Sequence, residues 1–290
     1  MSYFNLLGIE KEPFSTSPDP SFFYGSIHHR QALANLLIDL RLRRGLSVVI
    51  GDIGTGKTTL GRKLIQLLKQ RPNFIFHIVL NPTFKSEEVF FDSIAQRFNI
   101  VIPEGKSLLE IDYWDLIERF LYKKGIDEGQ TIVLIIDEAH KLNPVSLEAL
   151  RVLLNYETND SKLLQLVLLG QVELLPLLSS MPNLYQRISL KCILQPLQME
   201  ETLKLIEFRL AEAGYHGRNP LFSYEAVQMI HDVSGGYPRN IASLCHRALR
   251  HIAMHGREMV VPDVVKELIQ QEKDVEWIHK TISQKNVSCG

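Results

Sequence analysis

Short apolar runs alternate with segments of helical period along the first two thirds of the chain. The leucines between residues 33 and 40 recur at the spacing that lines one face of a helix, and an apolar run follows them. The five apolar runs span residues 46–50, 74–80, 132–136, 163–169 and 188–194. Because parallel neighbouring strands need a crossover that is usually a helix, this alternation predicts an α/β fold, with a parallel five-stranded sheet flanked by helices.

The pattern changes after Pro196, where the strand-like runs stop. The later segments have helical spacing and are separated by glycine-rich turns such as Gly235-Gly236. They span residues 200–213, 223–233, 238–255 and 262–271 and predict a small all-helical domain. We therefore expect four parts: an N-terminal arm and first helix packed on the core (1–45), an α/β domain (46–196), a helical domain (197–271) and a polar C-terminal tail (272–290).

A glycine-rich loop follows the first predicted strand and opens the next predicted helix. Its sequence, GDIGTGKT, satisfies the pattern G-x-x-x-x-G-K-[ST]. Glycines let the backbone fold closely around phosphate oxygens, so that N–H groups and a helix N-terminus point at the anion. Lys57 would neutralise the terminal phosphates, and Thr58 would bind Mg²⁺. The expected nucleotide-binding residues of this loop are Gly51, Asp52, Ile53, Gly54, Thr55, Gly56, Lys57, Thr58 and Thr59.

Two carboxylates follow the third predicted strand. The sequence TIVLIIDEAH is an apolar strand that ends in Asp137 and Glu138. Parallel strands present their carboxyl ends at one edge of the sheet, where ligands bind, so we expect this pair beside the glycine-rich loop. Asp137 would hold the Mg²⁺ shell, and Glu138 would orient or deprotonate the attacking water. The alternative interpretation is an acidic pair that caps the next helix.

The composition is that of an ordinary globular protein and selects no partner. Of the 290 residues, 45% are hydrophobic and 22% are charged, which argues against disorder. The 32 basic and 33 acidic residues leave a formal net charge of −1, so any contact with nucleic acid or anionic lipid must come from a local patch. One such patch is the cluster of Arg41, Arg43 and Arg44, which either contacts nucleic acid or forms the solvated end of a helix.

The sequence contains no segment that reads as a membrane span or a secretion signal. The aliphatic stretch at residues 132–136 is far shorter than the ~20 residues that cross a bilayer. The amino terminus lacks a basic leader and an apolar region ending in a small-residue cleavage site. The three cysteines are widely spaced, which argues against a disulfide framework. We expect a cytoplasmic protein without its own transmembrane segment, peripheral at the inner membrane through its partners.

Further motifs accompany the loop and the acidic pair. They are EPFSTSPDPSFFY at residues 12–24, followed by His29, then LLQLVLLGQVEL at 163–174, YQRI at 185–188 and GGYPRNIASL at 235–244. With these motifs the chain resembles the AAA+ ATPases and, within them, the ExeA/GspA-like group of the general secretion pathway. The resemblance implies the AAA+ architecture, in which a P-loop NTPase sheet is followed by a helical lid, with ATP and Mg²⁺ as cofactors.

The resemblance also implies roles for four residues outside the two main motifs. Asn81, after the second strand, matches the polar residue that restrains the water-activating glutamate until a partner engages. Gln171, after the fourth strand, is at the sensor-1 position, where a polar side chain contacts the γ-phosphate or the water. Arg187 matches an arginine finger that reaches into a neighbouring subunit's site, and Arg239 matches sensor 2 in the lid. A permanently charged guanidinium suits both arginine roles, although each could also form an ordinary ion pair.

The function implied by this resemblance is an Mg-dependent ATPase that couples ATP binding and hydrolysis to the assembly or operation of a secretion or pilus machine. The expected partners are further copies of the chain in ATP and secretion or pilus membrane proteins. Two alternatives stay open: an ATP-gated DNA-binding regulator of the TnsC and Mu B type, and a slow nucleotide switch that acts as a scaffold. The balanced charge argues against DNA. Longer members of the group add a peptidoglycan-binding module, so these 290 residues are not expected to bind the cell wall directly.

Overall fold

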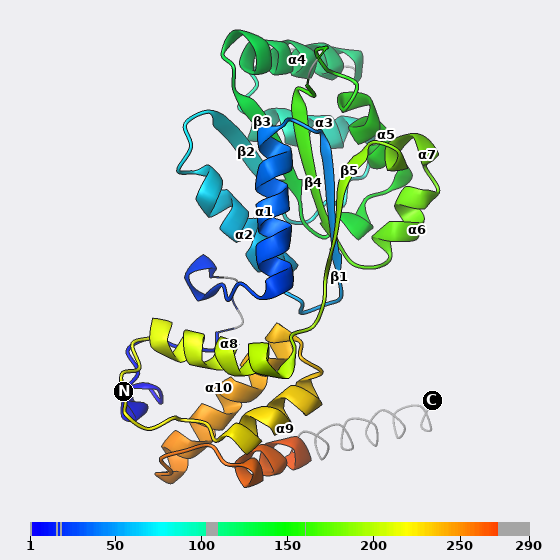
Figure 1. Cartoon of the computed structure of the whole chain (residues 1–290). Helices are drawn as coiled ribbons and strands as arrows, with labels where there is room; N and C mark the ends of the chain where they lie inside the picture. Colours follow the sequence, from blue (N-terminus) through cyan, green and yellow to red (C-terminus); the bar gives the residue numbers. More distant parts are fainter. Residues whose placement is uncertain (1, 16, 18, 103–109, 160, 272–290) are drawn as a thin grey trace, which may run out of the picture. The chain divides into compact units, whose positions relative to one another are not determined.

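The computed structural model describes residues 2–15, 17, 19–102, 110–159 and 161–271. The chain divides into two compact units, each with its own hydrophobic core (Figure 1). Gly25–Gln195 form an α/β unit, and Met1–Tyr24 together with Pro196–Gly290 form a helical unit. The tail expected at residues 272–290 lies outside the described residues.

A five-stranded sheet forms the centre of the α/β unit, as the apolar runs predict. The strands are β1 (Leu46–Gly51), β2 (Phe74–Val79), β3 (Thr131–Ile136), β4 (Leu164–Gly170) and β5 (Ile188–Leu194). All neighbouring pairs are parallel, in the order β2-β3-β4-β1-β5. The three central strands are buried along their whole length, which explains why they appear as continuous apolar runs. The predicted fold class is confirmed.

Helices cover both faces of this sheet. The helices α1 (Ile27–Arg41) and α2 (Lys57–Leu68) lie on one face, in front of the strands in Figure 1. Gly61 allows α2 to approach closely, because a Cβ atom there would lie 2.7 Å from a methyl carbon of Leu169. The hydrophobic cluster on the other face includes side chains from five further helices of this unit. They are α3 (Glu87–Arg97), α4 (Glu110–Tyr122), α5 (Pro144–Leu153), α6 (Leu174–Ser179) and α7 (Pro182–Tyr185).

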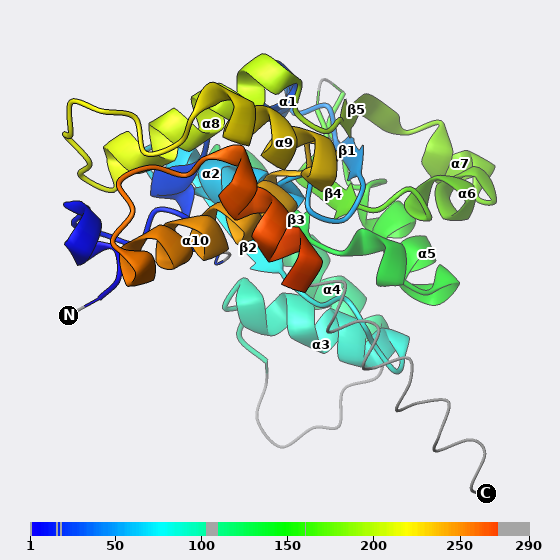
Figure 2. The same cartoon turned by 90° about the horizontal axis from the view of Figure 1, so that it is seen from below.

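The helical unit contains the segments that follow Pro196. Its helices are α8 (Met199–Glu212), α9 (Tyr224–Ser234), α10 (Pro238–His255) and a helix at residues 262–271. Figures 1 and 2 both show α9 and α10 side by side, and their apolar faces share one core. The predicted helical region is therefore confirmed. Within the described residues, every helix is too short or too polar to cross a membrane.

The N-terminal arm and the first helix, which we expect to pack together on the core, belong to different units. Ile9 and Phe14 are fully buried in the core of the helical unit. The backbone N–H groups of Glu10 and Lys11 donate to the carbonyl oxygen of Ala213 at 3.0 and 3.1 Å. The short 3-10 helices of the arm, η1 (Asn5–Leu7) and η2 (Pro20–Phe22), also pack apolar side chains against this core. Only α1 joins the α/β unit, because its buried residues face the sheet.

Candidate functional site

The loop between β1 and α2 has the backbone that the glycine-rich motif predicts. Gly54 and Gly56 have φ values of 85° and 99°, a left-handed region that glycine adopts without strain. Gly51 also has no room for a side chain, because a Cβ atom there would lie 2.6 Å from the Thr55 hydroxyl oxygen. Helix α2 begins at Lys57, so the free N–H groups of its first turn face the loop. The loop is therefore shaped to surround an anion.

Lys57 is buried inside this loop. Its Nζ donates hydrogen bonds to the carbonyl oxygens of Gly51 at 2.6 Å and Asp52 at 2.9 Å. Burial lowers the pKa of the Lys57 ammonium, and the nearby carboxylates of Glu138 and Asp137 act in the opposite direction. Burial of this charged group is costly, and the hydrogen bonds that its Nζ makes to described residues go to carbonyl oxygens that a phosphate could replace.

Thr58 and Asp137 join the two motifs across the sheet edge. The Thr58 hydroxyl donates to Oδ2 of Asp137 at 2.7 Å, and the backbone N–H of Glu138 donates to Oδ1 at 3.0 Å. Burial raises the pKa of the Asp137 carboxyl, while these two hydrogen bonds lower it.

The Thr58 and Asp137 pair fits a magnesium ion. A hydroxyl and a carboxylate in contact are two hard oxygen ligands of the kind that Mg²⁺ prefers. No cluster of three or more His, Cys, Asp or Glu side chains with metal-site geometry occurs in the described part of the chain. A magnesium ion held by Thr58 and Asp137 would take its further ligands from phosphate oxygens and water, which is its usual coordination in nucleotide sites.

Glu138 has an unusual backbone conformation next to this pair. Its φ of 55° is left-handed, which costs a residue with a side chain about 1–2 kcal/mol. It caps the short 3-10 helix η4 (Ala139–Lys141). Its Oε2 lies 3.5 Å from both His140 Nε2 and Lys141 Nζ. Strained residues held by their surroundings cluster at functional sites, and this one brings a partly exposed carboxylate to the sheet edge.

The structure places Asn81 and Gln171 at the same edge but gives them different contacts. Asn81 follows β2, whose last residue pairs with the last residue of β3, yet its Oδ1 accepts from the Thr83 hydroxyl at 3.2 Å. Among the described residues, Asn81 makes no hydrogen bond to Glu138. Gln171 follows β4, and its backbone N–H and side-chain amide lie 3.4 and 3.2 Å from the two ring nitrogens of His140.

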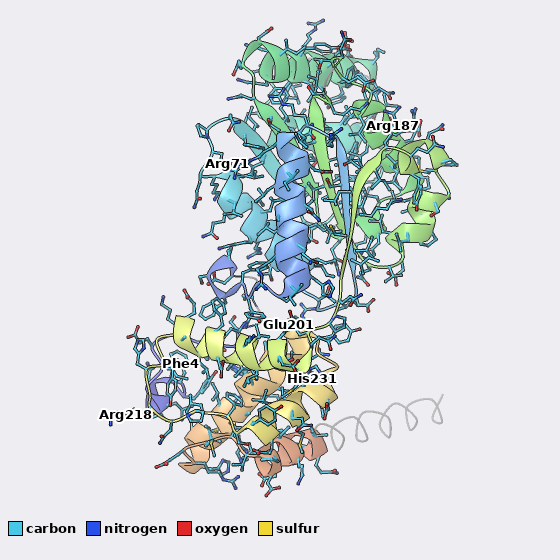
Figure 3. The ribbon with its side chains drawn as sticks, in the orientation of Figure 1. Phe4, Arg71, Arg187, Glu201, Arg218 and His231 are labelled. Atoms are coloured by element: carbon cyan, nitrogen blue, oxygen red, sulfur yellow. The ribbon has the colours of Figure 1, made fainter. Side chains whose placement is uncertain are left out.

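Arg187 and Arg239 lie apart from the loop. Arg187 immediately precedes β5, whose first residue pairs with Leu46 at the amino end of β1, whereas the loop follows the carboxyl end. The length of β1 corresponds to about 17 Å. The Arg187 guanidinium donates to the carbonyl oxygen of Leu154 at 3.4 Å (residue labelled in Figure 3). Arg239 is exposed on the first turn of α10 in the helical unit. Neither arginine has an ion-pair partner within the described ranges.

Two histidines at the site had no role in the sequence-based expectations. His29, from α1, is buried beneath the loop, with Nε2 at 2.9 Å from the Thr55 carbonyl oxygen and Nδ1 at 2.7 Å from the Ser26 hydroxyl. It supports the turn at Gly56, because a Cβ atom there would lie 2.9 Å from Nε2. His140 contacts Gln171 and Glu138. The position of His140, two residues after Glu138, indicated that it lies near the acidic pair. No sequence pattern indicated the contact of His29, because Thr55 is 26 residues away along the chain.

The arginine cluster before β1 has a structural explanation for one member. Arg43 has a left-handed φ of 50°. Its guanidinium donates to the Thr131 hydroxyl at 3.3 Å and to the carbonyl oxygens of Gly125 and Gly129 at 3.2 and 2.8 Å. Gly125 belongs to the π-helical turn η3 (Lys123–Asp127) before β3. Arg43 therefore ties this turn to the amino edge of the sheet.

The strand, glycine-rich loop and helix, together with an acidic pair at the same sheet edge, define a P-loop nucleoside triphosphatase. A family model described as an AAA domain matches residues 40–178. The fold is similar to Cdc6p from Pyrobaculum aerophilum, with a TM-score of 0.67 and 22% identity over 88% of this chain and 69% of that one. It is also similar to the RuvB Holliday junction branch migration motor of Thermotoga maritima, with a TM-score of 0.55 and 19% identity over 83% and 68%.

A more similar sequence is General secretion pathway protein A of Aeromonas hydrophila. It is 36% identical over 261 residues, which cover 89% of this chain and 46% of that protein. The chain therefore spans about half the length of this relative. The AAA domain match, the fold and this similarity confirm the predicted resemblance to the AAA+ ATPases.

Proposed function

We propose that this protein is an ATPase that binds ATP with Mg²⁺ at the carboxyl edge of the sheet and hydrolyses it with Glu138 as the water-activating residue. The observation that supports this proposal is the convergence of Lys57, Thr58, Asp137 and Glu138 at one edge through the contacts described above. Phosphoryl transfer depends mainly on positioning and on neutralising charge, which these four side chains can supply.

Each of these side chains has a separate role in the proposal. Lys57 exchanges its loop carbonyls for the terminal phosphates, and Thr58 and Asp137 hold the metal. When bound, Mg²⁺ neutralises charge on the phosphate oxygens. Glu138 orients the attacking water and accepts its proton, since its carboxylate is partly exposed at the edge.

A substitution at Glu138 tests the assignment of the water-activating residue. In Glu138→Gln we expect kcat to fall by about 100-fold or more while the Kd for Mg-ATP stays close to that of the wild type, because an amide cannot accept the proton. Phosphate release and titration calorimetry measure the two quantities. Glu148→Gln is the matched control, since Glu148 is an exposed glutamate of α5 paired with Arg151. Full turnover in Glu138→Gln would refute this role.

We also propose that ATP promotes a homo-oligomer in which Arg187 acts on a neighbouring subunit's nucleotide and Arg239 acts as sensor 2. The support for Arg187 is that it lies at the amino end of the sheet and has no ion-pair partner in the described residues. We expect Arg187→Ala to lower kcat with little change in Kd, and native mass spectrometry to detect larger assemblies in ATP than in ADP. Loss of nucleotide binding in Arg187→Ala would assign that residue elsewhere.

The cellular role that we propose is the assembly or operation of a secretion or pilus machine, through membrane proteins of that machine. The similarity to General secretion pathway protein A supports it. Cells that carry Lys57→Ala or Glu138→Gln test whether turnover is needed. We expect both variants to fail in secretion or piliation. If Glu138→Gln supports the process, ATP binding alone suffices and the chain acts as a nucleotide-dependent scaffold.

A further inference from the structure

His140 contacts both Glu138, the proposed water-activating residue, and Gln171, which the resemblance places at the sensor-1 position. Its Nδ1 is 3.4 Å from the backbone nitrogen of Gln171, and its Nε2 is 3.2 Å from the side-chain amide of the same residue. The Nε2 atom is also 3.5 Å from Oε2 of Glu138. Only 14% of the His140 side chain is exposed. One imidazole ring therefore contacts both the sensor-1 position and the water-activating candidate.

The backbone of Gln171 determines which ring nitrogen carries the proton. A backbone N–H can only donate, so Nδ1 of His140 must accept, and the neutral ring then has its proton on Nε2. Because Nε2–H is a donor, it must pair with the oxygen of the Gln171 amide. The orientation of an amide is assigned from its hydrogen-bond network in this way. The amide nitrogen, a donor, is then left for a ligand.

We propose that His140 is a positioning residue for hydrolysis: it fixes the amide of Gln171 with its donor side toward the nucleotide, and it aligns the Glu138 carboxylate through the same Nε2–H. A phosphate offers only acceptors, so an amide that turned its oxygen toward the phosphate would repel it. The carboxylate needs a fixed direction to take a proton from water. His140 performs both tasks without touching the reacting atoms.

This inference rests on the proposed function, because it assumes that Glu138 activates water. It differs from the role expected for Asn81, whose described side-chain contact is with Thr83. Lys141 also lies 3.5 Å from Glu138 Oε2, but it is 46% exposed and has no contact with Gln171 in the described structure. Of the groups that face the Glu138 carboxylate, His140 is therefore the one that connects it with Gln171.

Two substitutions of His140 separate its hydrogen bonds from its volume. His140→Phe keeps a ring of similar size and removes both nitrogens, whereas His140→Gln keeps one donor and one acceptor. We expect His140→Phe to lower kcat by about 10-fold to 100-fold, with KM and the Kd for Mg-ATP within about threefold of wild type, since misplaced groups slow chemistry without weakening binding. We expect His140→Gln to recover a large part of that loss. His251→Phe in α10 is the matched control, because His251 is similarly enclosed and lies in the helical unit.

A double substitution tests the connection to Gln171. If His140 acts through that amide, kcat of His140→Phe/Gln171→Ala equals kcat of the more damaged single variant instead of falling by the product of the two effects. Four results would each overturn the inference: multiplicative effects on kcat in the double variant, wild-type kcat in His140→Phe, loss of Mg-ATP binding in His140→Phe, or no recovery of kcat in His140→Gln.

Glu138→Gln is measured alongside to separate this inference from the proposed function. If Glu138→Gln retains turnover, the proposed function fails. If Glu138→Gln is inactive while His140→Phe has wild-type kcat, only the role of His140 fails.

Discussion

The two edges of the central sheet use charged side chains in opposite ways. At the carboxyl edge, the Lys57 ammonium donates to carbonyl oxygens of its own loop, contacts that an anion can replace. At the amino edge, the Arg43 guanidinium donates to Thr131 and to two carbonyl oxygens of the turn before β3, contacts that complete the fold. The difference between these two cations lies in their partners: the functional cation contacts groups that a ligand can replace.

The residues of the carboxyl edge also lower the stability of the fold. Burial disfavours the charged forms of both Lys57 and Asp137, because it lowers the pKa of the first and raises the pKa of the second. Glu138 adds a strained left-handed backbone. At the amino edge, Arg43 also has a left-handed backbone, but three hydrogen bonds offset that strain. The two edges should therefore respond differently to substitution, in activity and in stability.

The largest effect is expected for Lys57→Ala at the carboxyl edge. The variant should bind Mg-ATP about 100-fold more weakly or worse, because it loses the charge that neutralises the phosphates, a loss of roughly 3 kcal/mol. Its thermal midpoint without nucleotide should not fall, since a costly buried charge is removed. Titration calorimetry and a thermal melt measure the two quantities. Lys69→Ala, an exposed lysine just after α2, is the control. Retained affinity in Lys57→Ala would place the nucleotide elsewhere.

A smaller effect of the opposite kind is expected for Arg43→Ala at the amino edge. Losing three hydrogen bonds should lower the free energy of unfolding by about 2 kcal/mol. At a temperature where the variant is folded, its kcat and Kd for Mg-ATP should match the wild type. Chemical denaturation measures the first quantity, and Arg44→Ala, an exposed neighbour, is the control. A loss of nucleotide binding in folded Arg43→Ala would contradict the assignment of a purely structural role to the amino edge.

The smallest effect is expected for Asp137→Asn, in the free energy of unfolding measured without nucleotide. Because burial raises the pKa of Asp137 in the folded protein, its ionised form is penalised at neutral pH. Removing the charge should stabilise the fold by about 1 kcal/mol, or roughly 2–4 °C in Tm. As the pH falls through the raised pKa, the wild-type carboxyl is protonated, so the advantage of the variant should shrink. Asp127→Asn, an exposed control, should show no such trend; an advantage for Asp137→Asn that is equal at all pH values would contradict this explanation.

The sequence predicts the parts of this molecule that depend on local patterns. The strands, the glycine-rich loop after β1 and the acidic end of β3 all follow from periodicity and motif spacing. Contacts between distant residues do not. We expect the N-terminal arm to pack on the core, but no sequence pattern indicates that Phe14 packs in the helical unit. Likewise, no spacing rule brings His29 to Thr55 or His140 to Gln171, because those contacts depend on how helices and strands pack.

The most direct test of the central claim is titration calorimetry of the wild type and Asp137→Asn with ATP, in magnesium and in excess chelator. This measurement asks whether the loop after β1 and the acidic end of β3 together hold a magnesium nucleotide. For the wild type we expect saturable binding that weakens by about tenfold or more when magnesium is removed, and for Asp137→Asn we expect an affinity that no longer depends on magnesium. Absence of binding to the wild type, or the same magnesium dependence in both proteins, would contradict it.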